Sequence, residues 1–75
     1  MDKPGLSTIY IYLLDESVDV WRPVSAERID ESVFRIVEQD YDRSIEKWEF
    51  GAGDLVHCEL TQLSEGMCLV AKRRT

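Results

Sequence analysis

The chain has 75 residues, which is enough for one small domain and leaves little room for a deep catalytic pocket. Apolar residues make up 44% of the chain and are spread along its whole length, which argues against a disordered protein. The formal net charge of -6 repels a phosphate backbone, so nucleic acid is a poor candidate partner.

The two ends and the apolar runs predict where the protein resides. We expect one domain over residues 7–72, a flexible tail over residues 1–6 and a basic tail over residues 73–75. The longest apolar run is far shorter than the roughly 20 residues that cross a bilayer, and no signal peptide is visible. A cytoplasmic protein without a membrane partner is therefore expected, and its two cysteines should remain thiols.

Strict alternation of side chains predicts a first strand over residues 7–14. One face of this strand is suited to the core and carries Ile9, Ile11 and Leu13. The opposite face carries Tyr10, Tyr12 and Leu14. The polar segment at residues 15–17 predicts a turn after the strand.

A second, long strand is predicted over residues 18–29. Pro23 cannot donate a ladder hydrogen bond, so we expect a bend or a sheet edge at that residue. The core face is predicted to carry Val18, Val20, Arg22, Val24 and Ala26. The outer face then carries Asp19, Trp21, Pro23, Ser25 and Glu27.

The rest of the chain predicts three more strands joined by polar turns. These strands cover residues 33–38, 55–61 and 67–72. The polar loop over residues 38–47 is long for a compact β domain, which favours a functional role or a helical turn in it. No segment keeps a 3.6-residue apolar period, so the sequence predicts an all-β protein.

Five or six short antiparallel strands in so short a chain favour a small barrel, because closing the sheet removes exposed edges. The motifs VWRPV at residues 20–24 and WEFGAGD at residues 48–54 resemble a group of small, uncharacterised bacterial proteins with an SH3-like barrel. The resemblance covers residues 9–71. It implies the fold of a small SH3-like barrel and implies no activity.

The residues that enzymes use are not arranged for catalysis in the predicted strands. His57 is the only histidine and should point away from Cys58, so we expect a solvent-facing histidine and no enzyme. Cys58 and Cys68 are predicted to lie diagonally on one face at a Cα separation of about 7 Å or more, as two buried thiols. Asp40 and Asp42 belong to a solvated loop, and neither a metal nor another cofactor is expected.

The aromatic residues supply the strongest functional signal. If the first two strands form a hairpin, Tyr10, Tyr12 and Trp21 gather on its outer face beside Arg22 and Pro23. An aromatic cluster of this kind on a small domain is typical of a contact surface.

Two interpretations of this cluster remain open. In the first, the loop over residues 38–47 or the side chain of Trp48 covers the cluster and forms a second small core. In the second, the cluster is exposed and binds a partner. In the second case the protein is a non-enzymatic binding or adaptor module that contacts a protein, through basic or proline-containing segments, or a second copy of itself. The alternative function is an acidic inhibitor that imitates nucleic acid, which the net charge of -6 suggests.

Overall fold

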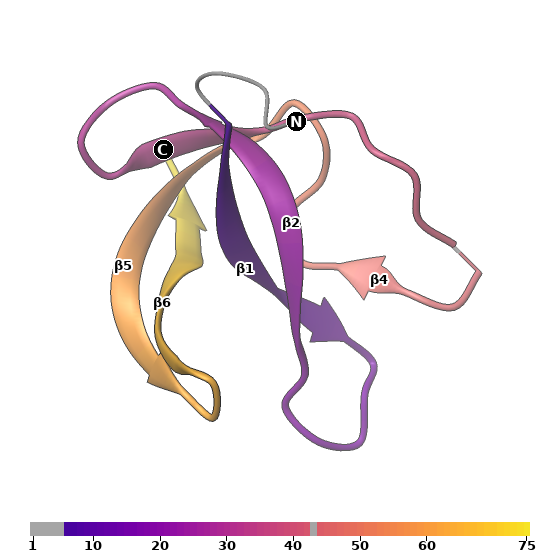
Figure 1. The fold of residues 1–75 in the computed structure, drawn as a ribbon. Helices are drawn as coiled ribbons and strands as arrows, with labels where there is room; N and C mark the ends of the chain where they lie inside the picture. Colours follow the sequence, from indigo (N-terminus) through magenta and orange to yellow (C-terminus); the bar gives the residue numbers. More distant parts are fainter. Residues whose placement is uncertain (1–5, 43) are drawn as a thin grey trace.

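The computed structural model describes residues 6–42 and 44–75. Within these residues the protein is all-β, as predicted, and there is no helix long and apolar enough to cross a membrane. The predicted flexible tail lies almost wholly outside the described residues, and Leu6 already belongs to the first strand. The strands are β1 Leu6–Leu14, β2 Trp21–Arg28, β3 Val33–Ile36, β4 Lys47–Trp48, β5 Leu55–Leu63 and β6 Gly66–Arg74 (Figure 1).

The six strands form one sheet in the order β2-β3-β5-β6-β1-β4, and β1 also pairs with β2. The pairings therefore run from β1 through β2, β3, β5 and β6 and return to β1. The prediction of a purely antiparallel sheet is wrong, because β1 and β6 pair in parallel at Tyr10 and Val70. When five strands that alternate in direction return to the first, one neighbouring pair must run in parallel.

The β1–β2 hairpin is shorter than the sequence suggests. Its last backbone contact is the bond from the Leu13 N–H to the Val20 carbonyl, and β2 begins at Trp21. Val18, predicted on the core face, is 68% exposed in the connecting loop. The chain turns away at Asp15, whose φ of 62° lies in the left-handed region that aspartate tolerates. The prediction of a core position for Val18 is therefore wrong.

Pro23 lies in the half of β2 that is paired on one side only. β1 pairs with Pro23, whereas β3 pairs only with residues 26–28 of β2. The missing N–H of proline costs no bond to β3 at this position. The predicted sheet edge is confirmed.

One core contains Ile9, Ile11, Val24 and Ala26 from the predicted core faces, whereas Val18, Val20 and Arg22 of the same predicted faces are not part of it. Each strand of the pairing cycle contributes to this core, and Phe50 closes it from the turn before β5. Its buried members are Ile9, Ile11, Val24, Ala26, Phe34, Ile36, Phe50, Val56, Cys58 and Ala71.

The predicted basic tail is wrong, because β6 continues to Arg74. Arg73 pairs with His57 in the ladder, and its guanidinium lies 3.7 Å from a carboxylate oxygen of Glu59. Arg74 forms an ion pair of 3.2 Å with Asp54 and lies over the Phe50 ring. Because Arg73 and Arg74 contact acidic and aromatic side chains of β5 and of the turn before it, they continue β6 and do not form a solvated tail.

The register of the β5–β6 hairpin separates the two cysteines. Cys58 pairs with Ala71 and Cys68 pairs with Thr61, so the two thiols lie on opposite faces of the hairpin. A one-residue difference from the expected register moves a side chain to the other face. Cys58 is buried, Cys68 is half-buried, and both are free thiols. The predictions of a shared face and of two buried thiols are therefore wrong.

Candidate binding site on the aromatic face

The structure brings the predicted aromatic residues together. Tyr12 is the cross-strand partner of Trp21, and their rings meet edge to face with centroids 5.1 Å apart. Tyr10 precedes Tyr12 by two residues in β1, so it lies on the same face, and its cross-strand partner is Pro23. We call Tyr10, Tyr12, Trp21 and Pro23 the aromatic face. Its three rings are half-buried and Pro23 is exposed.

Each tyrosine of the aromatic face is held by a carboxylate. The hydroxyl of Tyr10 donates to Glu65 Oε2 at 2.9 Å, and the hydroxyl of Tyr12 donates to Asp19 Oδ1 at 2.9 Å. The hydrogen bond to Glu65, followed by desolvation, raises the pKa of Tyr10 to about 12. The bond to Asp19 likewise raises the pKa of Tyr12. Both hydroxyls therefore remain protonated donors at neutral pH, and they hold the two carboxylates beside the rings.

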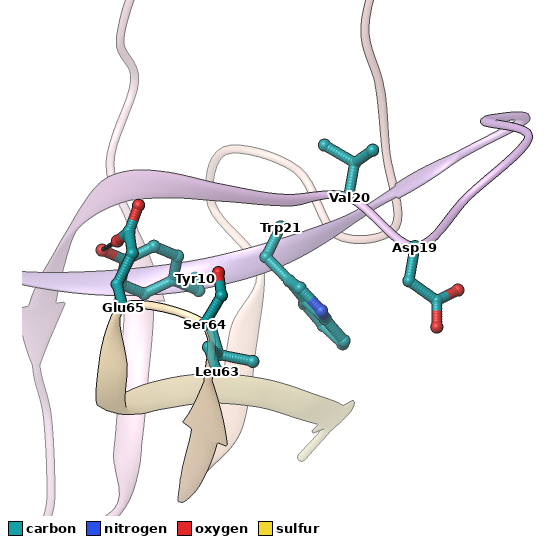
Figure 2. A pocket seen from close by; sticks show the side chains of 7 residues that line it. All are labelled: Tyr10, Asp19, Val20, Trp21, Leu63, Ser64 and Glu65. Atoms are coloured by element: carbon teal, nitrogen blue, oxygen red, sulfur yellow. Dashed lines mark hydrogen bonds between the residues drawn. The ribbon is translucent and has the colours of Figure 1, made fainter.

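A pocket of about 210 Å³ opens beside Trp21. Figure 2 shows the Trp21 ring between the turn that joins β5 to β6 and the side chain of Asp19. That turn consists of Ser64 and Glu65 and is followed by Gly66, whose φ of 118° suits glycine. The pocket is lined by Tyr10, Asp19, Val20, Trp21, Leu63, Ser64 and Glu65.

Sequence reasoning missed the side of this pocket that the β5–β6 turn forms. Leu63, Ser64 and Glu65 lie more than forty residues from Trp21 in the chain, and only the pairing of β6 with β1 brings them close. The polar residues predict a turn at this position, but the alternation of side chains along a strand does not show that this turn lies beside the first hairpin.

Arg22 lies on the opposite face of β2 from the aromatic face. Its Nε lies 2.8 Å from Glu46 Oε1, and its guanidinium lies 5.8 Å from the centroid of the Trp48 ring. The Trp48 indole donates to the same Glu46 oxygen at 2.9 Å, and this bond, together with Arg22, lowers the pKa of Glu46. The structure thus places Arg22 in a packed polar cluster and separates it from the other predicted binding residues.

The described loop residues, 38–42 and 44–47, lie over this cluster and not over Trp21. Tyr41 from the loop stacks on Trp48 with ring centroids 3.9 Å apart. In Figure 1 the described part of this loop and β4 lie on the far side of β1 and β2 from the β5–β6 hairpin. The prediction that the loop or Trp48 covers Tyr10, Tyr12 and Trp21 is therefore wrong. The loop packs on Trp48 and Arg22, because these two side chains share the face that the loop reaches.

The remaining candidate residues have separate surroundings. His57 is half-buried, and its Nδ1 lies 3.4 Å from the hydroxyl of Ser32. Cys58 points to the core on the other face, where burial raises the pKa of its thiol to about 11. Asp42 accepts bonds from the backbone N–H and the hydroxyl of Ser44, so it shapes the loop. Residues 6–42 and 44–75 contain no group of three or more histidine, cysteine or acidic side chains placed to hold a metal ion.

Comparisons of the chain with protein-family models, with curated proteins and with solved structures found no match. The most distinctive feature of the site is the pocket beside Trp21 on the aromatic face.

Proposed function

We propose that this protein is a small non-enzymatic binding module that contacts a protein partner, or a second copy of itself, through the aromatic face. The observation that carries the proposal is the difference between the two tryptophans. Trp48 is stacked against Tyr41 and bonded to Glu46, whereas Trp21 forms the wall of an open pocket. Rigid aromatic side chains that line a surface pocket are the residues that most often dominate protein–protein contacts.

We also propose that the sheet closes as a small barrel of the SH3-like type that the two sequence motifs resemble. The pairing of β1 with both β2 and β6 supports closure, as does the single core that all five strands of the cycle enclose. A cytoplasmic location agrees with the two free thiols. The fold class carries no activity of its own, so the functional proposal depends on the aromatic face.

A pull-down from lysate of the source organism tests the proposal. The baits are the wild type, Trp21→Ala and Leu60→Ala, each first shown to be folded by circular dichroism. Leu60 is the matched control because it is 66% exposed and does not line the pocket. We expect a partner that the wild type and Leu60→Ala retain and that Trp21→Ala loses. Equal retention by all three folded baits would contradict the proposal.

Self-association is tested by light scattering over a hundredfold range of protein concentration. A mass that rises with concentration for the wild type and not for Trp21→Ala supports a homodimer through the aromatic face. A constant monomer mass together with no retained partner would contradict both forms of the proposal.

The alternative proposal is an acidic inhibitor that imitates nucleic acid. The exposed loop between β1 and β2 favours it, because it carries Asp15, Glu16 and Asp19. A mimic would bind a nucleic-acid-processing protein with steep loss of affinity on adding salt, and Trp21→Ala would bind as well as the wild type. Loss of the partner in Trp21→Ala would therefore exclude the mimic.

A further inference from the structure

The pocket beside Trp21 combines apolar and aromatic walls with two carboxylates. Trp21, Tyr10 and Leu63 supply the walls, and Asp19 and Glu65 supply the charges. In Figure 2 the two carboxylates lie on opposite sides of the Trp21 ring. The carboxylates come from different turns, Asp19 from the loop before β2 and Glu65 from the turn before β6.

The charges of these two carboxylates are not balanced by a described basic residue. The ion pairs between described residues use the carboxylates of Asp15, Glu27, Glu46, Asp54 and Glu59. Asp19 and Glu65 belong to none of these pairs. Each accepts a tyrosine hydroxyl on one oxygen, Oδ1 of Asp19 and Oε2 of Glu65. The tyrosines orient the carboxylates but leave the negative charge of the pocket in place.

We infer that the pocket receives a basic side chain, arginine or lysine, from the protein partner. A cation over the Trp21 face gains the strongest of the cation–π contacts, and it can donate to Asp19 and Glu65 as well. A proline segment would leave both carboxylates without a cation, and an acidic segment would be repelled. The inference rests on the proposed function and names the chemistry of the partner.

The carboxylates act together with the rings, and neither alone defines the site. A charge on the open surface binds a cation weakly because water and salt screen it. Asp19 and Glu65 are themselves exposed. A cation held between them and the walls of Trp21 and Leu63 is partly shielded from water, so their charge attracts it more strongly than on an open surface. Tyr10 is a positioning residue, because it holds Glu65 against the pocket by its hydrogen bond.

Titration with small probes tests the inference without a partner protein. We would follow amide and indole resonances by NMR while adding N-acetyl-arginine amide, N-acetyl-lysine amide or N-acetyl-citrulline amide. Citrulline is the matched control because it keeps the shape of arginine and lacks the charge. We expect at least one basic probe to shift the Trp21 indole and Glu65 amide signals and to bind about tenfold more tightly than the citrulline probe.

Three charge variants show whether the pocket or the net charge is responsible. Asp19→Asn and Glu65→Gln should each weaken binding of the basic probe by about threefold to tenfold. Glu16→Gln is the control, because Glu16 is exposed in the same loop as Asp19 and does not line the pocket. It changes the net charge equally and should leave the affinity unchanged.

Two results would overturn the inference. One is a failure of both basic probes to bind more tightly than the citrulline probe. The other is an equal loss of affinity in Glu16→Gln and Asp19→Asn, which would assign the effect to the net charge. If the basic probes do not bind while Trp21→Ala still loses a captured partner, the proposed function stands and the basic side chain is excluded as the ligand.

Discussion

The two tryptophans show how one residue type serves two purposes in a small protein. Both lie next to β1, yet Trp48 packs against the core and Trp21 lines the surface pocket. Alternation placed Trp21 on the outer face of its strand correctly, because successive side chains of a strand point to opposite faces. It did not indicate what lies beside Trp21, because those neighbours come from another part of the chain.

The two cysteines should differ in reactivity. Cys58 is buried and burial raises its thiol pKa to about 11, so little thiolate forms at neutral pH. Cys68 is half-buried, and we expect a thiol reagent such as 5,5′-dithiobis(2-nitrobenzoate) to modify it first. Each single variant leaves one thiol, Cys58 in Cys68→Ser and Cys68 in Cys58→Ala. We expect Cys58 to react at least tenfold more slowly than Cys68 in these variants. Equal rates in the folded variants would contradict the burial of Cys58, and both thiols should react rapidly in denaturant.

At the scale of the elements, turns fix the registers that periodicity leaves open. Gly66 follows the two-residue turn between β5 and β6 and so sets which residues of the hairpin face each other. The same turn places Leu63 and Glu65 beside Trp21. A hairpin displaced by one residue would turn these side chains to other faces, so the turn residue contributes to the pocket through the register.

Replacing Gly66 with alanine should destabilise the protein through its backbone conformation. The φ of 118° is one that alanine rarely adopts, and no atom lies within 4 Å of an added Cβ, so the cost is conformational strain. We expect the free energy of unfolding to fall by about 1–2 kcal/mol in urea denaturation. Gly51→Ala is the control, because Gly51 is equally open and its φ is outside the left-handed region. Equal losses in the two variants would contradict this explanation.

At the scale of the whole molecule, contacts between distant segments complete the fold. Asp54, in the turn before β5, accepts a hydrogen bond from the Gly51 N–H and pairs with Arg74 at the end of β6. Arg74 also covers the Phe50 ring with its guanidinium 5.2 Å from the ring centroid. These contacts hold the end of β6 against the turn over residues 50–54, which closes the core.

The ionisation of Asp54 should make the stability of the protein depend on pH. The Gly51 N–H and then Arg74 favour the carboxylate and lower the pKa of Asp54 below its usual value. A group whose pKa is lower in the folded state stabilises the fold above its unfolded pKa, and this contribution disappears as the pH falls. We expect the melting temperature of the wild type to drop below about pH 4 more steeply than that of Asp54→Asn. Parallel curves for the two proteins would contradict this role.

The sequence by itself determined five of the six strands and the core positions of the first two. The alternation in β1 and in the second half of β2 predicted Ile9, Ile11, Val24 and Ala26 as buried, because the two-residue period of a strand relates each side chain directly to a face. The same period put Tyr10, Tyr12 and Trp21 together on the other face. These features depend on neighbours in the chain, so the chain alone predicts them.

Only the tertiary structure decided the parallel contact of β1 with β6, the position of Arg22 under the loop, and the pocket itself. Strand order and hairpin register depend on which distant segments pair, and periodicity contains no information about that choice. The pocket arises where the β5–β6 turn meets the first hairpin, so Glu65 lies beside Tyr10 although 55 residues separate them in the chain. The aromatic face was predictable from the sequence, and the depth and charge of its pocket were set by the packing of the fold.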